Sequence, residues 1–99
     1  MTQVLRVYNT EANALAGGST GMITSTTVDT SDAGAIENSV SAIPYYIYNR
    51  YYYRIEASEP VSEFHIDWDD GENNSPEKRN IEIIKLDSPN DFAVTEHVY

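Results

Sequence analysis

The hydrophobic and polar positions divide the chain into a short apolar start, a long polar stretch and a remainder rich in aromatic and β-branched residues. Residues 3–8 carry enough apolar positions to predict a short strand. Within the polar stretch, an acidic first turn and a glycine pair after residue 16 predict a short helix over residues 10–16. A cluster of β-branched residues predicts a short strand over residues 22–28.

From residue 43 onward, aromatic and β-branched runs alternate with polar turns, which predicts a succession of strands. Alternation over 61–68 places Ile66 and Trp68 on one face of its strand. In the next strand, Ile81 and Ile83 share one face, and Ile84 and Leu86 share the other. Strands spaced in this way favour an all-β sandwich over an α/β fold. The expected strands are 44–48, 51–57, 61–68, 80–86 and 92–99, with turns at 58–60 and 87–91.

The polar stretch, residues 9–42, contains only six large hydrophobic side chains in 34 residues. Burying so few groups does not offset an ordering free energy of about 1–2 kcal/mol per residue. The composition therefore predicts two parts: an extended, largely polar N-terminal arm over residues 1–42 and a folded β unit over residues 43–99. We expect a neighbouring protein subunit to order the arm.

The charge balance narrows the range of partners. Sixteen acidic residues against six basic ones give a net charge of −10, which repels nucleic acid and anionic membranes. With no cysteine, neither disulfides nor thiolate metal sites can form. The first residues lack a basic segment followed by an apolar run, and no apolar run reaches the roughly 20 residues needed to span a bilayer. We expect synthesis in a reducing cytoplasm.

The acidic turn after the Trp68 strand is a candidate calcium site. Its carboxylates are the hard oxygen ligands that this ion prefers, although the EF-hand register fails because Gly71 and Lys78 fall at the wrong loop positions. The spacing favours a solvated hairpin turn, with Gly71 supplying a positive φ, and leaves calcium as the alternative. The candidate ligands are Asp67, Asp69, Asp70 and Glu72.

Six tyrosines fall within residues 45–53, an unusual density. Tyrosine offers a rigid, amphipathic contact surface, so the cluster fits an intermolecular interface and packing within the chain equally well. Apolar residues of the polar stretch are added to the interface prediction. The predicted interface residues are Tyr45, Tyr46, Tyr48, Tyr51, Tyr53, Leu15, Met22 and Ile23.

The sequence Trp68-Asp69-Asp70-Gly71, answered by Glu96-His97-Val98-Tyr99, resembles the polycystic kidney disease (PKD) domain family, a variant of the immunoglobulin-like sandwich. The family's second glycine is missing from this turn. The resemblance implies an Ig/PKD-like β-sandwich with Trp68 and Ile66 in its core and structural roles for His97 and Tyr99. The family's last strand would follow Tyr99. We therefore expect a fragment of a longer protein, or else a partner that covers the open edge.

Neither histidine has a Ser or Cys partner in a recognisable nucleophile motif, and the sequence shows no Gly-x-Ser-x-Gly, His-Glu-x-x-His or phosphate-binding loop. We expect no enzyme activity and no cofactor. The segments Tyr53-Arg-Ile-Glu-Ala-Ser-Glu-Pro60 and His65-Ile-Asp-Trp-Asp-Asp-Gly71 also resemble virion structural proteins of tailed, cyanophage-type phages, over about residues 44–99. This implies a capsid decoration or cement protein, or a neck, tail or fibre component, made in the host cytoplasm and bound to capsid or tail proteins or to itself. The alternatives are a carbohydrate- or protein-binding adhesion module, with or without calcium, and an accessory domain of a hydrolase.

Overall fold

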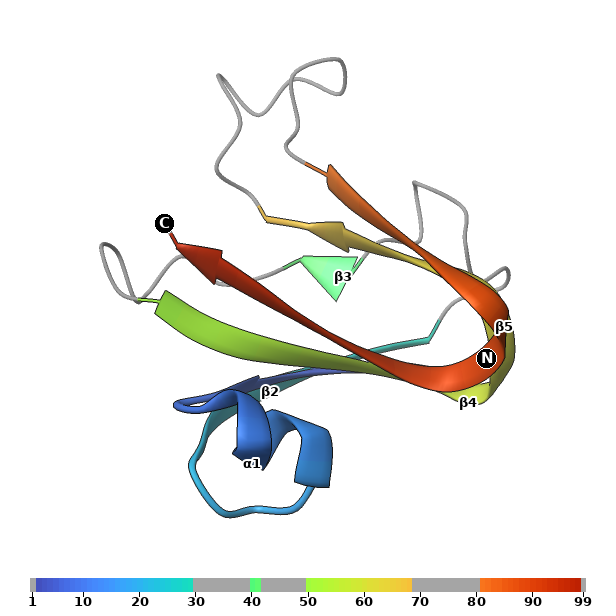
Figure 1. Cartoon of the computed structure of the whole chain (residues 1–99). Coiled ribbons are helices and arrows are strands. Elements are labelled where there is room, and N and C mark those ends of the chain that lie inside the picture. The colour runs from blue at the N-terminus through green and yellow to red at the C-terminus, as the bar shows by residue number, and fades with distance from the viewer. Residues whose placement is uncertain (1, 30–39, 42–49, 69–80, 99) are drawn as a thin grey trace.

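A computed structural model of the chain describes residues 2–29, 40–41, 50–68 and 81–98. The part that it describes is mostly strand, in agreement with the all-β prediction, and is shown in Figure 1. Its elements are β1 (Thr2–Tyr8), α1 (Glu11–Ala16), β2 (Met22–Asp29), β3 (Val40–Ser41), β4 (Arg50–Asp67) and β5 (Ile81–Val98).

The strands form one hydrogen-bonded sheet. β1 lies between β2 and β4 and runs antiparallel to both, with Leu5 opposite Thr26 on one side and Ile55 on the other. β5 runs antiparallel to β4 along its length. β3 pairs in parallel with the end of β4, where Val40 lies opposite Ile66.

The first 29 residues differ from the predicted arm. β1 is an interior strand with hydrogen-bonded neighbours on both sides, and β2 extends the sheet beyond it. Leu5 and Val7 of β1 are almost fully buried in the core. The arm prediction is therefore wrong for residues 2–29, because strand pairing supplies the order that the count of hydrophobic side chains left out. Residues 30–39 lie outside the described part of the chain.

The expected turns at residues 58–60 and 87–91 are also wrong. Both segments lie inside long strands, β4 and β5, which bend together (Figure 1). The pairing register shifts between Glu56 and Val61 and again between Val61 and Glu63. Bulges of this kind tolerate Pro60 and Pro89, which lack a backbone donor, and they sharpen the bend. Each pair of predicted strands is thus one bent strand. The predicted strand at 44–48 lies outside the described residues.

The bend folds the β4–β5 hairpin over, so that its two halves face each other across the core (Figure 1). Alternation along β4 turns Tyr53 and Ile55 inward and leaves Arg54 on the outer face. In β5, Ile84 and Leu86 pack against the core, whereas Ile83 is 46% exposed. The buried cluster consists of Leu5, Val7, Tyr53, Ile55, Val61, Phe64, Ile66, Trp68 and Ala93.

The predicted helix is confirmed, and both of its ends have a physical cause. Thr10 caps the start, where its side chain accepts a hydrogen bond from the Asn13 backbone N–H. Gly17 ends the helix in the left-handed region at φ 72°, and its N–H donates to the Asn13 carbonyl. Ala14 is the helical residue that is fully buried against the sheet.

Replacing Gly17 by alanine is expected to lower the free energy of unfolding by about 1–2 kcal/mol, because an L-residue is strained at this positive φ. The new Cβ would also lie 2.7 Å from Cζ of Arg54, so that side chain would have to shift. Gly18→Ala is the matched control, since a Cβ there meets nothing within 4 Å. Urea unfolding of both variants checks this; equal midpoints would contradict it.

Candidate functional site

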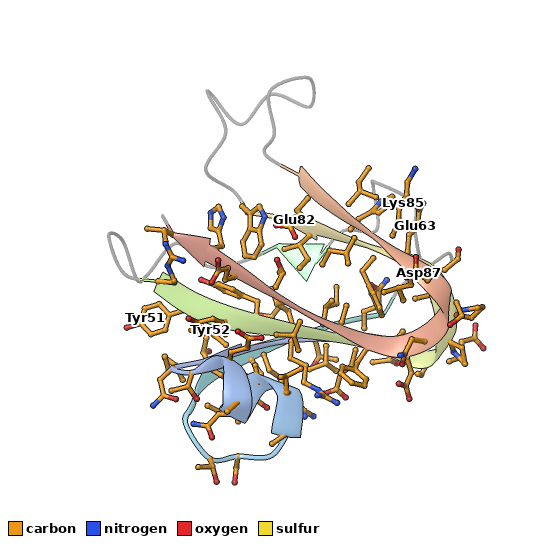
Figure 2. All side chains as sticks on the ribbon, viewed as in Figure 1. Tyr51, Tyr52, Glu63, Glu82, Lys85 and Asp87 are labelled. Carbon is orange, nitrogen blue, oxygen red and sulfur yellow. The ribbon has the colours of Figure 1, made fainter. Side chains whose placement is uncertain are left out.

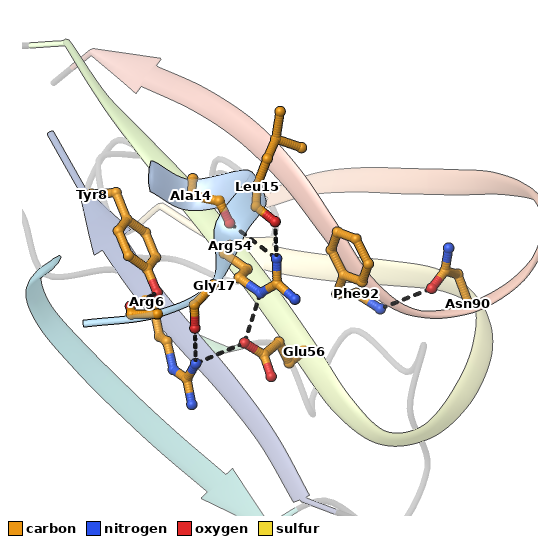
Figure 3. Close-up of polar contacts among 10 residues, drawn as sticks. Arg6, Tyr8, Ala14, Leu15, Gly17, Arg54, Glu56, Asn90 and Phe92 are labelled. Atoms are coloured by element: carbon orange, nitrogen blue, oxygen red, sulfur yellow. Dashed lines mark hydrogen bonds and ion pairs between the residues drawn. The ribbon is translucent and has the colours of Figure 1, made fainter. Parts of the chain in front are cut away.

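The outer face of β1 and β4 lies under α1 and is polar. We call Arg6, Tyr8, Arg54 and Glu56 the helix-covered face (Figure 3). Glu56 Oε1 lies 3.0 Å from a terminal nitrogen of Arg6 and 2.7 Å from Nε of Arg54. One carboxylate therefore bridges two guanidinium groups on neighbouring strands.

The same arginines hold the end of the helix. Arg54 donates to the carbonyls of Ala14 and Leu15, each at 3.0 Å, and its Cζ lies 3.9 Å from the centre of the Phe92 ring. Arg6 donates to the Gly17 carbonyl at 3.0 Å. These contacts satisfy carbonyls that a helix end leaves unpaired, so both cations are engaged in the fold.

Tyr8 completes this attachment. Its side chain is fully buried, and its hydroxyl donates to the Gly18 carbonyl at 2.7 Å. Since a buried hydroxyl needs a partner, this bond fixes the chain just after the helix. The helix-covered face is therefore a structural attachment for residues 9–21, and it offers no free cation to a ligand.

A second polar cluster lies between the two halves of the bent hairpin. Trp68 is 1% exposed. Its ring contacts Tyr53 edge-on, with the ring centroids 4.7 Å apart, and stacks on His97, with the centroids 4.0 Å apart and an interplanar angle of 7°. Its indole N–H donates to Glu82 Oε1 at 3.3 Å, and the hydroxyl of Thr95 donates to Glu82 Oε2 at 2.8 Å. Glu82, labelled in Figure 2, thus links the two arms of β5. The hydrogen bonds and ring contacts of this cluster hold its aromatic side chains in fixed positions.

His65 is the other histidine, and it is 5% exposed. By alternation along β4 its side chain lies on the opposite face of the strand from Trp68. Its Nε2 lies 3.2 Å from Glu63 Oε1, while Nδ1 has no hydrogen-bond partner among the residues that the structure describes. The two histidines therefore lie on different faces, which does not bring them together as a metal pair.

An open cavity of about 280 Å³ lies where the start of α1 meets β4 and β5. Tyr52 lines it from β4 and is partly exposed on the outer face, where Figure 2 labels it. Glu96 lines it from β5. Its Oε1 lies 3.1 Å from Nη1 of Arg50 in an ion pair, and both side chains are more than half exposed. We call this space the Tyr52 cavity; its lining residues are Glu11, Tyr52, Val94, Thr95 and Glu96.

Tyr52 was missing from the predicted interface, whereas Tyr53 was included. The structure buries Tyr53 in the core at 1% exposure and leaves Tyr52 toward solvent. The alternation of side chains along a strand could have shown this, because Tyr53 lies on the same face as the apolar Ile55, whereas Tyr52 lies on the opposite face. Tyr51 is partly buried and packs against the core.

The remaining predicted interface residues are scattered. Leu15 on α1 is 53% exposed and Met22 on β2 is 39% exposed, whereas Ile23 packs against the core. Of the predicted core residues, Ile66 and Trp68 are buried and His97 stacks on Trp68. Outside the described residues lie Tyr45, Tyr46, Tyr48, Asp69, Asp70, Glu72 and Tyr99.

The calcium prediction concerns mostly these undescribed residues; the side chain of Asp67, in β4, is not described either. Among the described side chains, which fall within residues 2–27, 50–66, 68 and 82–98, no group of three or more His, Asp or Glu is placed to hold a metal ion. The calcium site stays a prediction. In the described part of the chain, no helix is long and apolar enough to cross a membrane.

Comparison with protein-family models, with curated proteins and with solved structures finds no match for this chain. The resemblances to PKD domains and to phage virion proteins therefore stay predictions.

Proposed function

We propose that this chain is a non-enzymatic protein that binds other protein subunits of a large assembly. In its most specific form, the proposal is a virion structural protein of a tailed phage: a capsid decoration or cement protein, or a part of the neck, tail or fibre. An Ig/PKD-like sandwich is proposed as its fold. The bent hairpin, which places two halves of one sheet around a single core, supports that architecture.

The observation that carries the proposal is the difference in exposure between two adjacent tyrosines of β4. Tyr53 is in the core, while its neighbour Tyr52 presents a partly exposed ring at an open cavity. Tyrosine is enriched at protein interfaces because it offers a large, rigid contact area. In contrast, the titratable side chains with catalytic potential, His65, His97 and Glu82, make packing and hydrogen-bond contacts.

Residues 2–29 do not need a neighbouring subunit for their order. The sequence predicted an arm that needs a neighbouring subunit for its order, and residues 2–29 instead form β1, α1 and β2 on the chain's own sheet. The proposal therefore depends on the outer surface of β4 and β5 and on the acidic net charge of −10, which restricts unspecific association.

The experiment is photo-crosslinking in the cells that make the protein. A photoreactive benzoylphenylalanine replaces Tyr52 in one variant and Ser62, an exposed residue near the bend, in the control. We expect a discrete protein adduct from position 52 and none from position 62. Equal adduct patterns, or no protein adduct at position 52, would overturn the proposal.

A carbohydrate-binding adhesion module is the second candidate, because a partly exposed ring beside two carboxylates also suits a sugar. A glycan array separates the two functions. Glycan binding that Tyr52→Ala abolishes, without a protein adduct from position 52, would replace the assembly function with the adhesion function.

A further inference from the structure

The second half of β5 forms an outer edge of the sheet. Among the described residues, β4 is the only strand that pairs with β5. An edge strand presents backbone N–H and C=O groups that can pair with another chain. The bend and Pro89 interrupt the middle of β5, whereas residues 92–96 continue as strand beyond them, paired with β4, and contain no proline. We call these five residues the accessible edge.

The Tyr52 cavity lies beside this edge. Val94, Thr95 and Glu96 belong to both, while Tyr52 comes from the neighbouring strand and Glu11 from α1. An aromatic ring flanked by carboxylates attracts a cation, and Val94 gives an apolar surface for the stem of a long side chain. Lysine and arginine combine both properties.

The ion pair already present does not block such a ligand. Arg50 and Glu96 are 60% and 52% exposed, and exposed pairs of this kind contribute little to stability. An incoming cation can therefore replace Arg50 at Glu96 with little loss. A second copy of this chain is a poor occupant, because it brings a net charge of −10 to an acidic surface.

We propose that residues 92–96 of β5 accept an extended basic segment of a partner protein by strand addition, with one lysine or arginine side chain seated in the Tyr52 cavity. Backbone hydrogen bonds along the edge supply affinity, and the cavity supplies selectivity for a cation. The inference rests on the proposed function, because it names the chemistry of the partner that this surface binds.

The test uses the purified chain and a synthetic seven-residue peptide in which lysine alternates with threonine and valine. Two matched peptides serve as controls: one with acetylated lysines, which removes the charge, and one with N-methylated backbone amides, which keeps the charge and removes strand pairing. Titration calorimetry gives the affinities, and NMR hydrogen exchange reports on the amides of residues 92–96.

We expect the lysine peptide to bind and to slow exchange of the amides within residues 92–96 that point away from β4, and we expect both control peptides to bind at least tenfold more weakly. Tyr52→Ala should weaken binding about fivefold through the lost cation–π contact, whereas Tyr52→Phe should keep it. Circular dichroism verifies that both variants are folded. Glu11→Gln, at an exposed position, should give a smaller loss in the same direction.

No binding of the lysine peptide, equal binding of the N-methylated peptide, or exchange protection elsewhere in the chain would overturn the inference. The proposed function fails separately. A protein adduct from position 52 without peptide binding would support the assembly function and contradict strand addition. Peptide binding without a protein adduct would support strand addition and contradict the assembly function.

Discussion

Replacing Trp68 by alanine is expected to lower the free energy of unfolding by about 4 kcal/mol, the largest effect we expect from one side chain. Trp68 is 1% exposed and lies between Tyr53 and His97 in the space enclosed by the bent hairpin. Its loss leaves a cavity there and removes the hydrogen-bond donor from Glu82. A domain of this size has roughly 5–15 kcal/mol of stability, so a substantial unfolded population is expected.

Urea unfolding followed by far-ultraviolet circular dichroism measures the effect, because Trp68 is the only tryptophan and fluorescence is lost with it. Trp68→Phe keeps an aromatic ring but loses the hydrogen-bond donor, so its free energy of unfolding should fall between that of the unaltered protein and that of Trp68→Ala. Ile83→Ala, at a side chain that is 46% exposed, is the surface control and should change little. A Trp68→Ala midpoint close to that of Ile83→Ala would show that the two hairpin halves do not share a core.

Replacing Arg54 by alanine is expected to lower the free energy of unfolding by about 2–3 kcal/mol, because a charged donor is lost from several acceptors. The guanidinium holds Glu56 and the carbonyls of Ala14 and Leu15 at the same time. Glu56 retains Arg6 in the variant, which moderates the loss. The end of α1 should detach from the sheet before the rest of the fold opens.

Two variants separate geometry from charge at this position. Arg54→Lys should recover less than half of the loss, because one ammonium group does not reach all three acceptors. Arg50→Ala removes an exposed arginine from the same strand and should have little effect. Hydrogen exchange of the α1 amides, read beside the urea midpoint, tests the order of opening. Full recovery by lysine would mean that the charge alone matters.

Local signals in the sequence were sufficient for the elements whose causes are local. The helix at Glu11–Ala16 begins at a threonine cap and ends at a glycine, and both residues are readable in sequence. The β-branched cluster at residues 22–28 likewise predicted β2, and alternation separated the exposed Ile83 from the core-facing Ile84.

Long-range pairing was the part that composition could not supply. Among the described side chains of residues 9–27, Ala14 is the fully buried apolar one, so a count of hydrophobic residues underestimates the order of this segment. Arg54 and Tyr8 supply order through polar contacts with carbonyls distant in sequence. The bend was misread for a related reason, since proline marks a turn and a bulged strand equally well.

The interior position of β1 bears on how the chain forms during synthesis. Gln3 lies more than fifty positions before Ala57, its partner in β4, and is therefore synthesised earlier. Until β4 has been synthesised, β1 can pair with β2 but its other edge has no hydrogen-bond partner. Topologies dominated by such distant pairings fold slowly. A nascent chain arrested before residue 57 would therefore expose the unpaired edge of β1, a surface of the kind that chaperones bind.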